Sequence, residues 1–184
     1  MSRTATRGRR AQATADALGR GLAGDALVVC GGVSVGDHDH VRPALESLGV
    51  EQDFWGVALR PGKPTYFGVA PSGCLVFGLP GNPVSAMVTF LLLVRPALLA
   101  MQGGDPAARA LTARLTAAYR KVEGRAEAIR VRLAAGPGGW EIEPTGPQGS
   151  HVLTSMVGAD GLAFAPAAMV EIPAGTELPV ELIG

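Results

Sequence analysis

Cysteine, aromatic side chains and net charge are all scarce in this sequence. Its 184 residues include two cysteines, Cys30 and Cys74, and 5% aromatic residues. Two cysteines this far apart exclude a Cys-x-x-Cys metal site and a disulfide framework. The 16 basic and 16 acidic residues give a formal net charge of zero, which argues against a general polyanion-binding protein. Any basic binding site must therefore be local.

Long apolar runs and a secretion signal are also lacking. The longest apolar run, residues 83–94, is followed by Arg95 and Pro96 and falls short of the roughly 20 residues that a membrane span needs. No apolar segment near the N-terminus precedes a small-residue cleavage site. We therefore expect a soluble, cytoplasmic protein without a membrane partner.

The pattern of the chain changes near residue 104. Residues 1–104 alternate apolar, strand-like runs with helical periods, which predicts an α/β domain. We expect helices over 11–22, 40–48 and 83–101 and strands over 26–30, 54–59, 65–70 and 74–77, the last two forming a hairpin. The strand at 26–30 reads as a buried parallel strand. For the long helix, Asn82 is the expected N-cap, Pro83 the first helical residue and Pro96 the expected kink.

Residues 105–184 show short alternating runs separated by glycine and proline, which predicts a small all-β barrel or sandwich. The expected strands cover residues 111–117, 129–133, 140–144, 150–156, 161–165, 170–172 and 177–183. The basic start of the chain has two interpretations, a nucleic-acid-binding arm or a solvated terminus, and general behaviour of termini favours the second. The basic residues concerned are Arg3, Arg7, Arg9, Arg10 and Arg20.

The first of three glycine-bearing loops follows the strand at 26–30 and contains Gly31, Gly32, Ser34, Gly36, Asp37 and Asp39. Such a loop between a buried strand and a helix presents backbone N–H groups that bind anions. Its spacing matches neither the Gly-x-Gly-x-x-Gly dinucleotide fingerprint nor a P-loop, so neither of those sites follows.

Carboxylates at the end of this loop suggest a magnesium site at bound phosphate. Asp39 is favoured as the ligand, whereas Asp37 remains open between a ligand and the cap of a helix that begins at His40. A transition-metal site in Asp37-His38-Asp39-His40 is disfavoured, because consecutive residues seldom close such a site and His151 is the only other histidine.

The second and third loops add cations and hydrogen-bond donors. Arg60 and Lys63 flank Pro61 and Gly62, which suits a small divalent oxyanion, although a rigid turn with solvated charges explains the pattern equally well. In the third loop, residues 79–85, Ser85 is expected to point its hydroxyl and free N–H groups outward from the first helical turn.

Together and in this order, the three loops resemble the molybdopterin molybdenumtransferase family, bacterial MoeA and the E domain of gephyrin. The family motifs are Ser-Gly-Gly-x-Ser-x-Gly-x-x-Asp, Pro-Gly-Lys-Pro and Leu-Pro-Gly-Asn-Pro-x-Ser. The resemblance is strong over residues 24–102 and weaker beyond, through Gly124-Arg125 with Arg130, Gly149-Ser150-His151 and Gly161-Leu162. It implies a partial three-layer, MogA-like α/β domain at 1–104 and a small β-barrel-like domain at 105–184.

The resemblance also implies a reaction: Mg²⁺-dependent insertion of molybdate into adenylylated molybdopterin, with release of AMP. Asp39, and with it Asp37, would hold Mg²⁺, and Asp39, Lys63 and Ser85 would be the catalytic residues. Molybdate would be framed by Arg60, Lys63, Ser85, Arg130 and Ser150. The pterin substrate would be bound by Gly31, Gly32, Ser34, Gly36, Pro80, Gly81, Asn82 and Pro83.

The chain departs from the family in three respects. Arg60 stands where the family often has Lys, and Cys30 where it usually has Ser or Thr. The Thr-Gly-Asp/Asn-Glu motif that opens the family's α/β domain has no counterpart here. We therefore expect a C-terminal fragment, a truncated reading frame or one half of a split enzyme, with a separate N-terminal half or a MogA-like adenylyltransferase as partner. The family likeness further implies a homodimer.

Two further functions remain open beside the transferase. A pterin-binding or scaffold module would keep the fold without catalysis, as in the partner-binding role of the gephyrin E domain. A nucleic-acid role through the basic start is the more distant alternative, and we expect no nucleic-acid partner.

Overall fold

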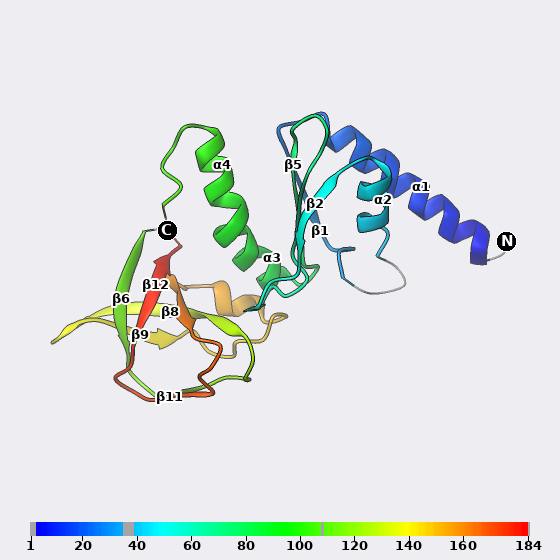
Figure 1. Cartoon of the computed structure of the whole chain (residues 1–184). Coiled ribbons are helices and arrows are strands. Elements are labelled where there is room, and N and C mark those ends of the chain that lie inside the picture. Colours follow the sequence, from blue (N-terminus) through cyan, green and yellow to red (C-terminus); the bar gives the residue numbers. More distant parts are fainter. Residues whose placement is uncertain (1–2, 35–38, 108, 184) are drawn as a thin grey trace. The chain divides into compact units, whose positions relative to one another are not determined.

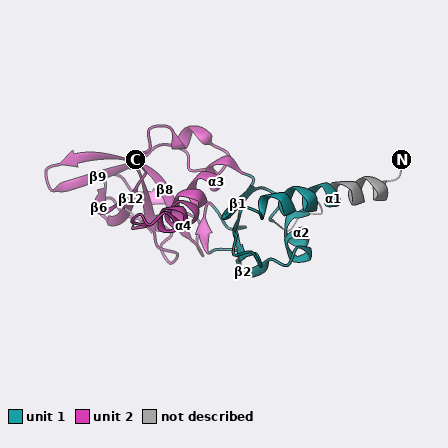
Figure 2. Cartoon of the chain, turned by 90° about the horizontal axis from the view of Figure 1, so that it is seen from above, with its two compact units in different colours: residues 1–57, 62–81 teal, residues 58–61, 82–184 magenta. Residues whose placement is uncertain are grey.

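The computed structural model describes residues 3–34, 39–107 and 109–183, with side chains from residue 11 onward. Its contacts divide the chain into two compact units, one of residues 1–57 and 62–81 and the other of residues 58–61 and 82–184 (Figure 2). We describe each unit by itself. This division differs from the predicted sequence domains 1–104 and 105–184, which stay a prediction.

Unit 1 is built on a four-stranded mixed sheet in the order β1-β5-β4-β2 (Figure 1). The parallel pair is β1 (Ala26–Cys30) with β5 (Leu75–Leu79), and β4 (Tyr66–Val69) runs antiparallel to both β5 and β2 (Glu51–Trp55). The strand at 26–30 and the hairpin are thus confirmed. The predicted strand 54–59 is wrong in its bounds, because Gly56 turns the chain with a φ of +89° that suits glycine.

Two helices, α1 (Arg3–Gly21) and α2 (Val41–Ser47), pack on one face of this sheet. Their core with the strands contains Leu18, Val41, Leu45, Tyr66 and Val76. Leu27 and Val29 of β1 pack against that core, whereas Val28 and Cys30 are exposed. The prediction of a buried strand is therefore wrong for one face of β1, because the helices cover only the other.

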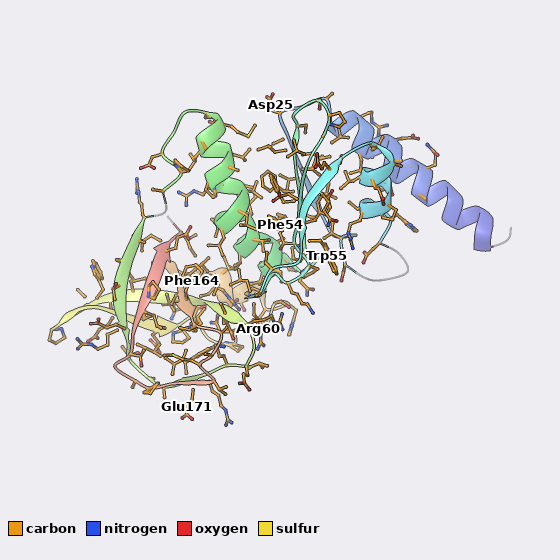
Figure 3. The ribbon with its side chains drawn as sticks, in the orientation of Figure 1. Asp25, Phe54, Trp55, Arg60, Phe164 and Glu171 are labelled. Carbon is orange, nitrogen blue, oxygen red and sulfur yellow. The ribbon has the colours of Figure 1, made fainter. Side chains whose placement is uncertain are left out.

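The opposite face of the sheet carries a row of aromatic rings. Phe67 lies between Phe54 and Phe77, with ring centroids 5.7 Å and 5.1 Å apart. Phe54 and Trp55 are consecutive on β2 (Figure 3), so they point to opposite faces of the strand. Trp55 accordingly packs against the helix-covered core, and its Nε1 donates to the Val33 carbonyl at 2.8 Å.

Unit 2 is a small barrel of five strands with one strand appended. The ring runs β10-β12-β6-β9-β8 and closes where β8 pairs with β10, while β3 (Leu59–Arg60) adds to β8 in parallel. Closure removes free sheet edges, which stabilises so small a sheet. The ring strands are β6 (Ala110–Leu115), β8 (Ala126–Gly136), β9 (Gly139–Pro144), β10 (Gly161–Ala165) and β12 (Glu177–Leu182).

The predicted all-β part is confirmed, with two corrections. Residues 150–156 are not a strand but a turn followed by a 3-10 helix, Leu153–Met156, stabilised by short-range bonds such as Ser155 N to Val152 O at 3.0 Å. A two-stranded pair of β7 (Tyr119–Arg120) with β11 (Glu171–Ile172) was only half predicted. Its strands are too short to show an alternating pattern.

A continuous helical segment precedes the barrel within unit 2. It consists of α3 (Pro83–Thr89), a π-helical turn (Phe90–Val94) and α4 (Arg95–Met101). Pro96 does not break it; the wider π turn ends just before Pro96, where the missing N–H and the proline ring disturb regular helical bonding.

This segment is long and apolar enough to cross a membrane by length and composition alone, with 19 residues and a mean hydropathy of 2.0. The predicted shortfall is therefore wrong, since the helix continues through Arg95. The core helix of a globular protein passes the same test; here 28% of the segment is buried, including Val84 and Val88, which pack against Ala128 and Leu162 of the barrel.

We expect the core of unit 1 to be sensitive to small cavities. Val76→Ala removes a fully buried side chain on β5, whereas Val69→Ala truncates a side chain on β4 that is 37% exposed. Val76→Ala should lower the free energy of unfolding by about 2 kcal/mol and Val69→Ala by about 0.5 kcal/mol. Urea unfolding followed by circular dichroism checks this. Equal losses in the two variants would show that the assigned core is wrong.

The two cysteines should react differently with a thiol reagent. Cys30 is exposed, whereas Cys74 is 1% exposed, and burial, followed by the charge of Asp25, raises the pKa of its thiol. We expect iodoacetamide to label Cys30 in the folded protein and Cys74 only after unfolding in urea. Peptide mass spectrometry assigns the label. Labelling of Cys74 at the rate of Cys30 in the folded chain would contradict the structure.

Candidate functional site

In unit 1, the first and third glycine loops meet at the carboxyl ends of the parallel strands β1 and β5. Gly31 N donates to the Leu79 carbonyl at 2.8 Å, and a Cβ on Gly81 would lie 3.5 Å from the Gly31 Cα. Gly32 has a φ of +71°, and a Cβ there would lie 2.7 Å from Val41. Two loops this close place their backbone groups side by side at the edge where α/β sheets bind ligands.

Ser34 and Asp39 line a hollow of about 640 Å³ next to α2. Its other walls include Arg42, Glu46, Gln52 and Tyr66. Gly36 and Asp37, predicted to bind substrate and metal, lie outside the described residues. No three His, Cys, Asp or Glu side chains gather as a metal site among the residues that the structure describes. Mg²⁺ commonly uses only one or two protein carboxylates with substrate phosphates, and Asp39 and Glu46 are the carboxylates that line this hollow.

Arg42 also lines this hollow, although no motif in the sequence pointed to it. Its guanidinium lies 4.4 Å from the centre of the Trp55 ring, and its Nη2 donates to Gln52 Oε1 at 3.3 Å. Its Nε is buried and has no hydrogen-bond partner among the described residues. Burial raises the pKa of Tyr66 in the same wall, an effect that the Arg42 charge opposes. Stacking on the Trp55 indole fixes the position of the Arg42 guanidinium, which could then bind an anionic or aromatic group.

The second loop, residues 60–64, contributes to both units. Arg60 lies in β3 on the barrel of unit 2, whereas Lys63 belongs to unit 1 and is exposed. Within unit 1, Thr65 Oγ1 donates to the Gly62 carbonyl at 2.6 Å and Val57 N to the Lys63 carbonyl at 2.9 Å. The loop is therefore ordered by its own hydrogen bonds, and joint action of Arg60 and Lys63 stays a prediction.

The third loop continues into unit 2 through Asn82 and Pro83. Asn82 is the N-cap of α3 and Pro83 its first residue, as predicted, but the Asn82 side chain makes no cap hydrogen bond. Its Nδ2 donates instead to Ser150 Oγ at 3.1 Å, joining two predicted site residues that lie 68 positions apart. Ser85 is only 4% exposed, so the prediction that it points outward is wrong. The first turn of α3 is buried at this position together with Val84.

Arg130 is the most deeply buried cation of the predicted site. It is 0% exposed; Nε donates to Ser155 Oγ at 3.2 Å and Nη1 to the Ala128 carbonyl at 3.3 Å. Its Nη2 is buried without a hydrogen-bond partner among the described residues. Burial lowers the pKa of Arg130 and Arg60 lowers it further, while Tyr119 and Glu127 raise it. A buried donor without an acceptor is costly unless a ligand supplies one.

The loop that carries Ser150 is tied directly to the Arg130 backbone. Gln148 Oε1 accepts from Arg130 N at 2.8 Å, and Gln148 Nε2 donates to the Arg130 carbonyl at 3.2 Å. Thr145 N also donates to that carbonyl at 2.9 Å. Within unit 2, the segment 148–150 therefore bonds to the Arg130 backbone through Gln148 and to Asn82 through Ser150. Gln148 and Ser155 were missed because their partners lie 18 and 25 positions away in the chain.

A hollow of about 520 Å³ opens beside this segment in unit 2. Arg60, Tyr119, Lys121, Glu127 and Gly149 line it. The Lys121 ammonium already donates to three carbonyls, those of Val122, Arg125 and Ala167, so it serves the fold. Arg60, whose side chain is partly exposed, and the exposed Arg120 are the other cations that line this hollow. The predicted residues thus fall into a unit 1 set around Gly31, Gly81 and Asp39 and a unit 2 set around Arg130 and Ser150.

Comparisons with known proteins match both parts of the chain. Residues 2–100 match the model of a probable molybdopterin binding domain, and residues 112–183 match the MoeA C-terminal region, domain IV. Two curated relatives are the molybdopterin molybdenumtransferase of Haemophilus influenzae, 38% identical over 72% of this chain, and molybdopterin molybdenumtransferase 2 of Mycobacterium tuberculosis, 37% identical over 85%. This chain covers 33% and 39% of their lengths.

The fold comparison agrees with the sequence comparison. The crystal structure of the molybdopterin biosynthesis MoeA protein from Pyrococcus horikoshii superposes with a TM-score of 0.70 and 34% identity. It covers 88% of this chain, which spans 38% of that protein. The mixed α/β sheet followed by a five-stranded barrel is therefore a fold shared with known proteins, and the chain belongs to the MoeA family of molybdenum cofactor biosynthesis.

Proposed function

We propose that this chain inserts molybdate into adenylylated molybdopterin and releases AMP, or performs the C-terminal share of that reaction. Its family membership and the names of its relatives support the proposal. The chain spans about two fifths or less of those relatives, so the complete reaction is proposed here and not carried over.

One observation carries this proposal, the buried guanidinium of Arg130 with its unpartnered Nη2. A planar guanidinium offers several donors in a fixed fork, which suits an oxyanion better than an ammonium does. Its Nε and Nη1 are held by Ser155 and the Ala128 carbonyl, so the free donor is fixed in direction. An acceptor oxygen of molybdate, the substrate of the reaction, would satisfy it.

The neighbouring groups would complete the binding of a tetrahedral dianion. Arg60 would add a second positive charge and Ser150 a hydroxyl whose position Asn82 fixes. Lys63 and Ser85 are proposed to join them. The backbone groups at Gly31, Gly32, Pro80 and Gly81, with Ser34, Asn82 and Pro83, would hold the pterin nucleotide, and the proposal extends to Gly36. In this arrangement the residues would bind and orient the two substrates. Such orientation removes a large share of the activation free energy of a group transfer.

Asp39 would hold Mg²⁺ beside the pyrophosphate, and Asp37 is proposed as its second ligand. When bound, the ion would offset the charge that develops as the P–O bond breaks. Asp39 and Ser34 share the walls of the unit 1 hollow, which supports this assignment. We propose a pterin substrate, a homodimer, and a separate N-terminal half or MogA-like adenylyltransferase as partner.

A pterin-binding scaffold without catalysis is the second candidate function. The match of residues 2–100 to a probable molybdopterin binding domain supports it, because that match concerns binding and not catalysis. Such a module would bind the pterin nucleotide tightly, release no AMP and be insensitive to Asp39→Ala.

Arg130→Lys should weaken molybdate binding by about tenfold or more, because the ammonium keeps the charge but loses the fixed fork. Arg132→Lys is the matched control, since Arg132 lies two residues along the same face of β8 and is exposed. Isothermal titration of the folded variants with sodium molybdate gives both affinities. Equal affinities in Arg130→Lys and the wild type would remove Arg130 from the site.

Asp39→Asn should reduce Mg²⁺-dependent AMP release from adenylylated molybdopterin by roughly tenfold or more, because the ion would lose its charged ligand. Asp53→Asn, at an exposed position on β2, serves as the control. The rate of AMP release is measured by chromatography, first with this chain alone and then with a separate N-terminal half added. No AMP release by the wild type under either condition would contradict the transferase and leave the scaffold.

A further inference from the structure

Glu127 is a buried carboxylate that the proposed reaction does not use. It lies on β8, 1% exposed, on the face that also carries Ile129 and Val131 of the barrel core. Its Oε1 accepts the Tyr119 hydroxyl at 2.9 Å, whereas its Oε2 is buried with no hydrogen-bond partner among the described residues. Burial, with the Glu127 charge, raises the pKa of Tyr119 far above its usual range, so the phenol remains a neutral donor.

The group that faces Oε2 is Arg60 of the second loop. Its Nη1 lies 3.9 Å from Glu127 Oε2, and the two residues are direct neighbours in the parallel register of β3 and β8. Ala126 N donates to the Ala58 carbonyl at 3.1 Å, which fixes the β3 backbone on the barrel. The Arg60 side chain is 37% exposed, compared with 2% for that of Glu127. The buried Glu127 carboxylate therefore lies beside the Arg60 guanidinium, while the Arg60 side chain stays partly exposed to solvent.

Removing a carboxylate from water is costly, so a buried one is retained only where its partners compensate. Among the described residues, the ion pair of Glu127 is with Arg60 and not with Arg130, which starts from the opposite face of β8, although the Glu127 charge also raises the pKa of Arg130. Tyr119 satisfies only one oxygen. The remaining oxygen points to Arg60, and both side chains line the 520 Å³ hollow that Gly149 of the Ser150 loop also lines.

We propose that Glu127 is a positioning residue that orients the Arg60 guanidinium toward the oxyanion substrate. The proposal rests on the function proposed above, since it takes Arg60 as a molybdate ligand. The direction in which molybdate affinity changes when Glu127 is neutralised distinguishes this role from a simple charge effect. A negative charge close to an anion site weakens anion binding by Coulomb's law. If Glu127 orients Arg60, its neutralisation must weaken binding instead.

The test measures molybdate affinity by isothermal titration in four chains: wild type, Glu127→Gln, Arg60→Met and the double variant. We expect Glu127→Gln to weaken binding about tenfold, comparable to one charge-assisted hydrogen bond. Arg60→Met should weaken binding at least as much, and the double variant no more than Arg60→Met alone, because Glu127 acts through Arg60. Glu171→Gln, at an exposed position of β11 (Figure 3), controls for loss of one negative charge.

The outcomes separate this inference from the function it rests on. No molybdate binding by the wild type, or unchanged binding in Arg60→Met, defeats the proposed oxyanion site and the role of Glu127 with it. Weak binding in Arg60→Met with unchanged or tighter binding in Glu127→Gln overturns the role of Glu127 alone. Additive losses in the double variant overturn it as well, since they would place Glu127 outside the action of Arg60.

Circular dichroism shows whether Glu127→Gln folds. If it does not, Tyr119→Phe takes its place, because loss of the phenol hydroxyl frees Glu127 Oε1 without removing the charge. We expect this variant to bind molybdate about threefold more weakly, through Arg60. Wild-type affinity in folded Tyr119→Phe would then overturn the proposal.

Discussion

The burial of two opposite charges on one strand is the constraint on which unit 2 depends. Strand β8 carries Arg130 on one face and Glu127 on the other, and both are almost fully removed from water. Each charge must be met by fixed partners, because a buried charge without them is strongly destabilising. Ser155 of the 3-10 helix and the Ala128 carbonyl bond the Arg130 guanidinium, and Tyr119 bonds the Glu127 carboxylate. On this strand of the barrel, the atoms without a hydrogen-bond partner among the described residues are Arg130 Nη2, which a ligand would meet, and Glu127 Oε2, which faces Arg60.

Unit 1 meets a different constraint, the close approach of two loops at the ends of parallel strands. Gly31 and Gly81 can lie almost in contact because neither has a side chain. That approach aligns the first loop with the start of the third, while Asp39 and Ser34 line the hollow next to α2. Backbone groups therefore dominate the set of predicted residues in unit 1, whereas charged and polar side chains dominate the set in unit 2.

Much of the fold could be predicted from the sequence, because local patterns determined it. The apolar run at 26–30 and the Asn82-Pro83 helix start each appear where expected. The prediction of a strand at 150–156 was wrong, because the local bond of Ser155 Oγ to the Val152 carbonyl and the bond of Thr145 Oγ1 to the Ser155 carbonyl favour a 3-10 turn over the β pattern. The long helix continues through Arg95 and Pro96 because a π-helical turn before them accommodates the proline. No local sequence pattern predicts that turn.

The candidate site was predictable where its motifs are contiguous and not where they are assembled by folding. Asn82 and Ser150 were both named from motifs, but their mutual hydrogen bond replaces the expected side-chain cap. Glu127, Tyr119 and Gln148 carry no motif, and only the barrel brings them to Arg60 and Arg130. Their roles follow from burial and pairing, which a single sequence does not contain.

Anomalous X-ray diffraction at the molybdenum edge, from crystals of this chain soaked in molybdate, tests the central claim most directly. The account predicts a molybdenum peak in unit 2, with an oxygen of its molybdate within hydrogen-bond distance of Arg130 Nη2. A chain that binds molybdate elsewhere, or crystals that leave Arg130 Nη2 without an oxyanion while molybdenum is bound, would contradict it.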